Sequence, residues 1–285
     1  TLAVNLSPGK FGELVDCWGG LEDLKTNLLQ VLHSRSFIDD PTRMLRAVRL
    51  EQRLDFNITD DTVQLMVASL PLLDDVSGDR IRHEIEKILH EECPEAVLVR
   101  LQEIGVAGAI HSSMAYIVGE WLETKFALAR EYSLLADIAP VYFGLWLYSL
   151  SIDESLSVCN RLQVSTKAEE SLRQIGRVKS ILSELDASAN PSDVVRNLDD
   201  LSDIALDVLV VAVDSQDVRK NIEKFRNELR FIQPVTNGND LLELGLMPGP
   251  DLGRILLRLK MAWLDGEISS KEEERVLVEA LVAER

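Results

Sequence analysis

The sequence predicts an all-α protein with one short β-hairpin at its N-terminal end. Leu, Ile, Val and Ala dominate the apolar residues, and aromatic residues make up only 5% of the 285 residues, which favours helices over sheets. Apolar residues recur at a helical spacing of about 3.6 residues from Leu21 onward. Asp, Ser and Pro, which are typical at helix starts, stand before many of these apolar runs.

The first residues predict the hairpin. The β-prone runs 1–6 and 11–15 flank Pro8 and Gly9, which form a common turn pair. A lone hairpin is only marginally stable in water, so its pairing partner is expected in a preceding part of the protein. We therefore expect residues 1–20 to be the end of a domain whose remainder is missing from the sequence.

Helices are expected to follow one another through the rest of the chain. Apolar spacing places them near 21–33, 41–53, 60–69, 77–91, 94–104, 114–131, 134–150, 152–161, 167–186, 191–197, 201–213, 215–229, 239–244, 250–264 and 269–283. The sharpest change in composition lies at 231–238, where Pro and Gly separate a long charged helix from a short terminal segment. A boundary is therefore expected near residue 231.

Cysteine usage and hydropathy indicate a cytoplasmic protein without a membrane partner. Cys17, Cys93 and Cys159 are odd in number, far apart and form no C-x-x-C pair, so no disulfide framework or zinc motif is expected. We expect no secretory signal, because no basic stretch precedes an apolar run near residue 1. The uncharged run 138–152 is shorter than the roughly 20 residues that span a bilayer, which predicts a buried helix instead.

The formal net charge of −18 argues against tight, non-specific binding of nucleic acid. Phosphate contacts depend on Lys and Arg, and a strongly acidic chain repels a polyanion. Net charge is a sum over the whole surface, so a basic groove can coexist with acidic outer faces. Any contact with RNA is therefore expected to be local.

The most informative segment is 37–50, with the sequence FIDDPTRMLRAVRL. Asp40 is a candidate helix cap, and Pro41 suits the first helical position. At about 100° per residue, four arginines fall within roughly a third of the helix circumference. They are Arg43, Arg46, Arg49 and Arg53. Such a stripe needs anionic partners, and internal carboxylates and phosphates are equally good candidates on sequence alone.

This segment resembles the neck helix of class II tRNA nucleotidyltransferases (CCA-adding enzymes) and bacterial poly(A) polymerases. That helix opens with Glu-Asp-x-x-Arg followed by Leu-Arg-Ala-x-Arg. Upstream, residues 16–24 are similar to the family's Asp-Pro-Phe-Gly-Gly-x-x-Asp-Leu hinge, with Gly19, Gly20 and Asp23 at matching positions. Downstream, residues 77–85 are similar to its Ser-x-Glu-Arg-Ile-x-x-Glu helix. The three ordered motifs cover roughly residues 1–100.

The C-terminal part carries a weaker resemblance. Residues 237–256 look like the family's tail, with its Gly-x-Asp-Leu and Pro-Gly-Pro-x-x-Gly, although two helix starts would explain the same residues. Residues 105–230 carry no pattern that matches the family. The resemblance implies a division into a head remnant (1–20), a neck for base recognition and RNA binding (21–110), a helical body (111–230) and a helical tail (231–285).

The resemblance implies that Asp40 and Arg43 select the incoming nucleotide. Adenine and cytosine both present an exocyclic amino donor beside a ring-nitrogen acceptor, so one carboxylate and one guanidinium can satisfy either base. Guanine and uracil would set a carbonyl against the carboxylate. Asp39 stands where the family usually has Glu, which shortens the reach of that supporting carboxylate.

Further arginines complete the implied site. Arg46, Arg80 and Arg82 are the remaining nucleotide-binding candidates, and Arg49 and Arg53 are the RNA-binding candidates. For Arg80 and Arg82 the alternative is an ordinary surface ion pair with Asp79 or Glu84, which is worth little. His83, His90 and Cys93 are not expected to form a metal site, because one face of one helix rarely supplies a closed shell.

The resemblance also shows what the chain lacks. Nucleotidyl transfer needs carboxylates that hold two Mg²⁺ ions, and the family supplies them as a Gly-Ser followed by an Asp-x-Asp strand. No Asp-x-Asp occurs in this chain. The resemblance implies an intact enzyme that uses Mg²⁺ with ATP or CTP on the 3′ end of tRNA or another RNA. This chain is expected to be inactive without the missing nucleotidyltransferase head.

A second hypothesis is a non-catalytic helical module that binds protein and derives from the same family. The net charge of −18 and the unassigned residues 105–230 favour it. An upstream Gly-Ser and Asp-x-Asp strand in the parent reading frame would favour the enzyme, and their absence would favour the module.

Overall fold

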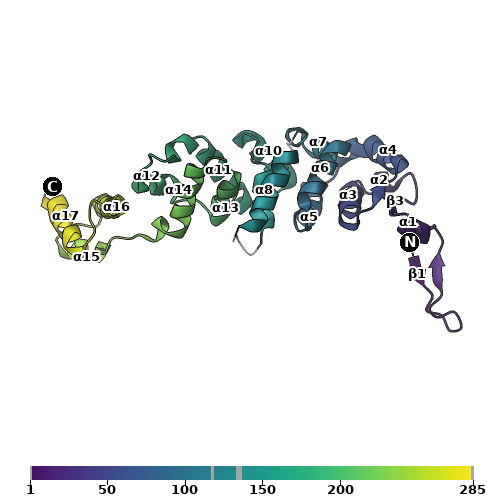
Figure 1. The fold of residues 1–285 in the computed structure, drawn as a ribbon, viewed down its shortest axis with the longest axis horizontal. Helices are drawn as coiled ribbons and strands as arrows, with labels where there is room; N and C mark the ends of the chain where they lie inside the picture. Colours follow the sequence, from purple (N-terminus) through teal and green to yellow (C-terminus); the bar gives the residue numbers. More distant parts are fainter. Residues whose placement is uncertain (1, 117–118, 133–136, 284–285) are drawn as a thin grey trace. The chain divides into compact units, whose positions relative to one another are not determined.

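The structure, a computed structural model, describes residues 2–116, 119–132 and 137–283. Within those residues it consists of helices and two small two-stranded sheets, which confirms the all-α prediction (Figure 1). The chain divides into two compact units, residues 1–173 and 174–285.

The first unit holds the predicted site. In chain order its elements are β1 (Leu2–Val4), β2 (Leu14–Asp16), α1 (Gly20–Lys25), β3 (Leu28–Leu29), α2 (Ser36–Asp39), α3 (Arg43–Leu54), β4 (Asn57–Ile58), α4 (Asp60–Ser69), η1 (Leu70–Leu73), α5 (Gly78–Leu89), α6 (Pro94–Ile104), α7 (Val106–Ile110), η2 (Ser112–Met114), α8 (Gly119–Glu131), α9 (Ala139–Trp146) and α10 (Ile152–Leu162). The division between the units falls within α11 (Thr166–Lys179).

The second unit continues the helical succession. Its elements are η3 (Leu182–Leu185), α12 (Pro191–Leu198), α13 (Asp203–Ala212), α14 (Gln216–Asn227), η4 (Leu229–Phe231), α15 (Gly238–Glu243), α16 (Pro250–Leu264) and α17 (Lys271–Ala283). Predicted ranges such as 94–104 and 250–264 match α6 and α16, because Pro94 and Pro250 fix the first turn of each helix.

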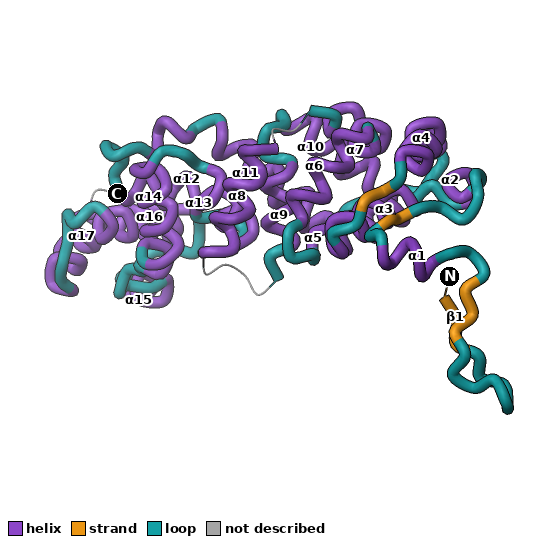
Figure 2. The backbone as a smooth tube through the Cα atoms, turned by 45° about the vertical axis from the view of Figure 1, so that its right-hand side comes forward, coloured by secondary structure: helices purple, strands orange, loops and turns teal. Residues whose placement is uncertain are grey.

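The predicted hairpin is present. Strands β1 and β2 pair antiparallel, with Leu2 opposite Asp16 and Val4 opposite Leu14, as the orange strands of Figure 2 show near the N-terminus. The second strand is shorter than predicted, because Phe11 lies in the connecting turn. Phe11 and Trp18 are 78% and 60% exposed, so the hairpin leaves large apolar side chains open to solvent.

The prediction of one helix over 21–33 is wrong beyond Lys25. Helix α1 ends there, and Asn27 adopts the left-handed conformation with φ 54°, which a helix cannot continue through. Leu28 and Leu29 then form β3, which pairs in parallel with β4. The apolar spacing of these leucines was compatible with a helix, but their backbone groups are satisfied by a distant strand.

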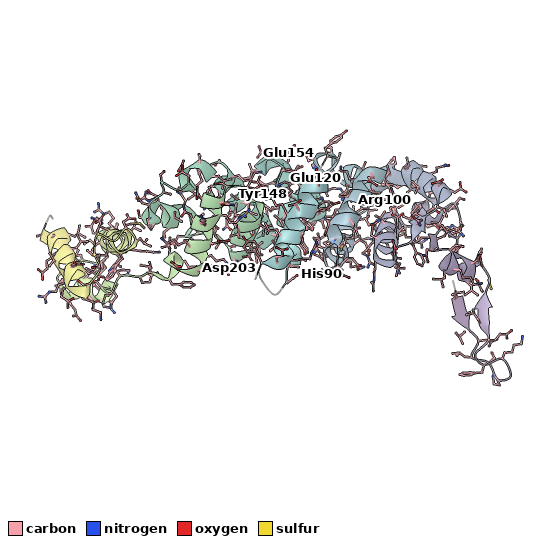
Figure 3. The ribbon with its side chains drawn as sticks, viewed as in Figure 1. His90, Arg100, Glu120, Tyr148, Glu154 and Asp203 are labelled. Carbon is pink, nitrogen blue, oxygen red and sulfur yellow. The ribbon has the colours of Figure 1, made fainter. Side chains whose placement is uncertain are left out.

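Helices α3, α5 and α6 pack together and form the core beside the predicted site. Met44, Leu45 and Val48 of α3 are fully buried, and α3 contacts both α5 and α6. The buried Glu51 accepts a hydrogen bond from the Ile58 backbone N–H at 3.0 Å and from Arg100 Nε at 3.0 Å, which ties α3 to β4 and α6 (Arg100 is labelled in Figure 3). The charged faces of α3 and α5 therefore remain available at the surface.

The uncharged run 138–152 contributes a buried helix, as predicted. Val141, Leu145 and Trp146 of α9 are at most 2% exposed. Among the described residues no helix is long and apolar enough to cross a membrane. The predicted helices 114–131 and 134–150 include residues 117–118 and 134–136, which lie outside the described residues. The remaining parts contain α8 and α9.

The C-terminal helices have a small core of their own. It is formed by Leu241, Leu246, Ile255, Leu259 and Val278 of the last three helices and their connections. Glu274 is 1% exposed and accepts hydrogen bonds from the backbone N–H groups of Val235 at 3.0 Å and Thr236 at 2.6 Å, and from the indole N–H of Trp263. This carboxylate joins the segment that follows residue 231 to α16 and α17.

Candidate functional site

Asp40 lies at the junction of α2 and α3. Its Oδ1 accepts hydrogen bonds from the Thr42 backbone N–H at 3.1 Å and from Thr42 Oγ1 at 2.7 Å. The carboxylate thus caps the turn that leads into α3, as the sequence indicates, although the helix begins at Arg43 and not at Pro41. This cap fixes the direction in which the carboxylate points.

Arg80 reaches Asp40 from a second helix. Its Nη2 lies 2.9 Å from Asp40 Oδ1, although the two residues are 40 positions apart. Arg43 is the first residue of α3, and its Nη1 donates one long hydrogen bond of 3.3 Å to the Ser36 carbonyl. Asp40 and Arg80 side chains are 31% and 55% exposed, so a ligand can reach both.

The carboxylate of Asp40 is ionised over the whole physiological range. Partial burial acts to raise its pKa, but the hydrogen bonds from Thr42 and the positive charges of Arg80 and Arg43 outweigh burial and lower the pKa. All three hydrogen bonds that Asp40 accepts through its side chain from described residues go to Oδ1. Its Oδ2 is therefore available to accept a hydrogen bond from a ligand.

The arginine stripe of α3 divides into two halves. Arg49 Nη1 pairs with Glu91 Oε1 at 2.7 Å, and both side chains are largely buried. Arg53 lies 3.9 Å from the same carboxylate and is 57% exposed. Arg46 is exposed, and its guanidinium has no hydrogen bond or ion pair with any described residue. Arg49 thus has an internal carboxylate as its partner, whereas Arg43 and Arg46 face solvent.

Arg82 and Asp39 do not contact Asp40 but pair with other side chains. Arg82 donates a hydrogen bond to Glu86 at 2.6 Å and also pairs with Asp79. The bond to Glu86 contributes most to raising the pKa of the Arg82 guanidinium, and together with the bond to Asp79 it outweighs the effect of partial burial. Asp39 lies 3.7 Å from Arg35 in an exposed pair. The structure therefore brings Arg80 and Arg43 to Asp40, but engages Arg82 within its own helix.

Part of the chain matches a family model, and the chain has curated relatives. Residues 55–117 match the model described as "Probable RNA and SrmB- binding site of polymerase A". An A-adding tRNA nucleotidyltransferase of Geobacter sulfurreducens is 31% identical over 290 residues, which cover 96% of this chain and 33% of the relative. An A-adding tRNA nucleotidyltransferase of Halalkalibacterium halodurans is 28% identical over 95% of this chain and 63% of the relative.

Solved structures share the fold over the full length. A CCA-adding enzyme in complex with ATP aligns with a TM-score of 0.81 at 26% identity, over 100% of this chain and 70% of that one. The Thermotoga maritima CCA-adding enzyme complexed with tRNA aligns with a TM-score of 0.79 at 26% identity, over 99% of this chain and 70% of that one. The chain is therefore similar over nearly its whole length to A-adding and CCA-adding tRNA nucleotidyltransferases, and it resembles the class II family. It spans 33% and 63% of the length of the two curated relatives.

The motif that was predicted to be a hinge, residues 16–24, forms a capped turn. Gly19 has φ 74°, a left-handed conformation that glycine adopts without strain. Asp16 Oδ1 accepts the N–H of Gly20 and its Oδ2 accepts that of Leu21, each at 2.9 Å, and the bond from Leu21 contributes most to lowering the pKa of Asp16. Asp23 accepts from Gln30 Nε2 at 2.7 Å. Asp16 was not selected as a site residue, although its place before two glycines is a sign of this turn.

A groove of about 830 Å³ lies between α3, α5 and the start of α6. Its walls include Arg49, Gln52, Arg53, His83, Glu86, Lys87, His90, Glu91, Glu92 and Cys93. His90, labelled in Figure 3, is 60% exposed at the end of α5. The sequence indicated Arg49 and Arg53 but not Lys87 or the histidines, because only the packing of α5 beside α3 brings them together.

The described residues include no cluster of three or more His, Cys, Asp or Glu side chains that could hold a metal ion. The two-metal chemistry of nucleotidyl transfer needs such a cluster of carboxylates.

Proposed function

We propose that this chain is the nucleotide-selecting and RNA-binding part of an enzyme that adds nucleotides to RNA 3′ ends. The observation that carries the proposal is the Asp40 carboxylate, which Thr42 and Arg80 hold beside Arg43 with one oxygen available. The CCA-adding structures in complex with ATP and with CTP, and the A-adding relatives, support nucleotide binding by this part of the family.

Base selection would follow from how the hydrogen-bond donors and acceptors of the base match those of Asp40 and Arg43. Oδ2 of Asp40 accepts the exocyclic amino group that adenine and cytosine share, and the guanidinium of Arg43 donates to the adjacent ring nitrogen. Arg43 is suited to this because its single hydrogen bond to Ser36 is long, at 3.3 Å, and leaves other N–H groups for a ligand. Guanine and uracil present a carbonyl to the carboxylate, which repels them.

Arg80 supports this arrangement as a brace. A carboxylate that also carries a hydrogen bond from Arg80 at 2.9 Å keeps one rotamer, so the free oxygen stays aimed at the ligand. Asp39, Arg46 and Arg82 remain proposed members of the nucleotide site. For Arg46 the support is its exposure without a partner among the described residues.

RNA binding is proposed for the same part of the chain. The exposed Arg46 and Arg53 lie on one side of α3, and Arg53 lines the groove beside Lys87. The family-model match over 55–117 and the tRNA complex of the Thermotoga maritima enzyme support RNA as the partner. Since the net charge is −18, this basic region is a local exception on an acidic surface.

The chemistry itself is proposed to lie in a nucleotidyltransferase head. That head would supply the Mg²⁺ carboxylates and the triphosphate site, while this chain reads the base and holds the RNA. We propose that residues 1–20 are the remnant of this head and that residues 21–110 form the neck. Residues 111–230 would then form the body and residues 231–285 the tail, with Gly19, Gly20 and Asp23 at the hinge between head and neck. The cytoplasm, where tRNA is processed, is the proposed location.

The nucleotide preference of the head-containing enzyme tests the proposal. Arg43→Ala should reduce kcat/KM for ATP and CTP by about tenfold or more, as loss of a charged hydrogen bond predicts, while the thermal melting temperature stays near that of the wild type. Arg173→Ala, which removes an arginine from an exposed ion pair with Glu169 on α11, is the matched control. Equal kinetics in both variants would refute the role of Arg43 in base selection.

A further inference from the structure

Arg161, in the last turn of α10, donates hydrogen bonds to a turn that is far away in sequence. Its Nη2 donates to the Leu73 carbonyl at 2.7 Å, and its Nη1 donates to the Val76 carbonyl at 3.1 Å. Leu73 is the last residue of η1, and Val76 lies in the short connection between η1 and α5. One planar guanidinium that donates to two carbonyls fixes the orientation of the turn as well as its position.

Gly78 brings the backbones of α5 and α10 together at the same place. A Cβ atom on Gly78 would lie 2.1 Å from the carbonyl oxygen of Arg161 and 3.1 Å from the carbonyl carbon of Leu162. Only glycine therefore allows the start of α5 to approach the end of α10 so closely. The guanidinium and the glycine together clamp the start of α5 against α10.

The clamped turn carries Arg80. The Arg80 backbone N–H donates to the Ser77 carbonyl at 3.1 Å in the first turn of α5, two residues after Gly78. Its guanidinium then extends to Asp40 at 2.9 Å. A displacement of the start of α5 would therefore move Arg80 away from the carboxylate.

We infer that Arg161 is a positioning residue for base selection, which acts by holding the start of α5 so that Arg80 stays on Asp40. The inference rests on the proposed function for its effect on nucleotides, but the positioning of Arg80 is a property of this chain alone. It assigns a role to a residue in the stretch 105–230, where no sequence pattern indicated one.

A matched control exists in the second unit. Arg219 donates through Nε to the Val210 carbonyl at 3.0 Å and through Nη2 to the Val213 carbonyl, so it too grips two backbone carbonyls. Neither carbonyl belongs to an element that carries Asp40 or Arg80. Arg161→Met and Arg219→Met should therefore cost comparable stability, and only the first should affect the base site.

The first measurement uses the 285-residue chain. A carbon NMR titration of the Asp40 carboxyl reports whether Arg80 still lies against it, because the charge of Arg80 helps to lower the Asp40 pKa. Arg161→Met should raise the pKa of Asp40, Arg219→Met should leave it unchanged, and Arg161→Lys, which can reach at most one carbonyl well, should give an intermediate value. Arg161→Lys also serves if Arg161→Met fails to fold.

The second measurement uses the head-containing enzyme. The ratio of kcat/KM for ATP to that for GTP should fall about fivefold in the Arg161 variants and stay constant in Arg219→Met. An unchanged Asp40 titration in both Arg161 variants would overturn the positioning role. If the titration shifts but neither Asp40 nor Arg161 variants change the ATP-to-GTP ratio, the positioning stands and the proposed function falls.

Discussion

At the scale of single residues, Asp40 combines two functions that are usually separate. As a cap it accepts both hydrogen bonds from Thr42, and as a charged partner it holds Arg80. The bonds from Thr42 and the bond from Arg80 all go to Oδ1, so these structural contacts leave Oδ2 available to a ligand. The cap is therefore compatible with the base-reading role that we propose for Asp40.

Glu274 provides a prediction at the same scale. Burial acts to raise its pKa, but hydrogen bonds from Thr236, Trp263 and Val235 outweigh burial and lower it. Glu274→Gln should reduce the free energy of unfolding by about 1–3 kcal/mol, because the neutral amide accepts these bonds less well and turns an N–H toward other donors. Urea denaturation of the chain, monitored by circular dichroism, measures the change.

The pH dependence of the same residue follows from the direction of its pKa shift. A lowered folded pKa means that the stabilisation by Glu274 is complete above the ordinary value of 4.5 and is lost as the pH falls through the lowered pKa. The difference in stability between the wild type and Glu274→Gln should therefore shrink in acid. A difference that stays constant down to the acid transition would contradict the role of the charge.

At the scale of elements, the close approach of α5 and α10 can be tested at Gly78. Gly78→Ala should destabilise the protein by about 3 kcal/mol, because the new methyl group meets the carbonyl oxygen of Arg161 and neither backbone can easily yield. Gly253→Ala is the control: this glycine of α16 has nothing within 4 Å of the added Cβ, so alanine should stabilise by about 0.5–1 kcal/mol. Thermal melting should show a lower melting temperature for Gly78→Ala and a higher one for Gly253→Ala, each relative to the wild type.

Most helices were predictable because their apolar faces and caps are local properties of the sequence. Helices α6 and α16 begin at prolines, and α9 is an uncharged run that is buried. The failure over 21–33 has a non-local cause, since Leu28 and Leu29 pair with a strand that begins at Asn57. Periodicity cannot distinguish such residues from the continuation of a helix.

The candidate site was predictable only in part for the same reason. The junction at Asp40 and Arg43 was visible in one segment, and so was the arginine stripe. Whether Arg80 or Arg82 would meet Asp40 depends on the rotation of α5, which follows from how Ile81 and Ile85 pack inside the protein. Arg161 gave no signal at all, because its contacts lie 85 and 88 residues away.

At the scale of the whole molecule, an acidic chain is proposed to bind a polyanion. The net charge of −18 opposes RNA, so the binding energy must come from a few arginines and lysines near α3 and α5. Binding should then favour an RNA of the right shape over RNA in general. It should also weaken steeply with salt, in proportion to the number of phosphates contacted.

RNA binding across a salt series tests this proposal. The chain should bind tRNA more tightly than an unrelated single-stranded RNA, and Arg46→Ala or Arg53→Ala should each reduce the slope of log affinity against log salt by about one. Arg196→Ala, which removes the same charge from an exposed ion pair on α12, should leave the slope unchanged. No binding of either RNA at low salt would favour the protein-binding module instead.

The most direct test of the central claim is the nucleotide preference of Asp40→Asn in the head-containing enzyme. Asparagine keeps an oxygen for Thr42 and Arg80 but replaces the free oxygen by an amino group, which suits the carbonyl of guanine or uracil. We predict that the ratio of kcat/KM for ATP to that for GTP falls by about tenfold or more, as the loss of a hydrogen bond to a charged group implies. A ratio equal to that of the wild type, in a variant that melts normally, would show that Asp40 is a helix cap and does not read the base.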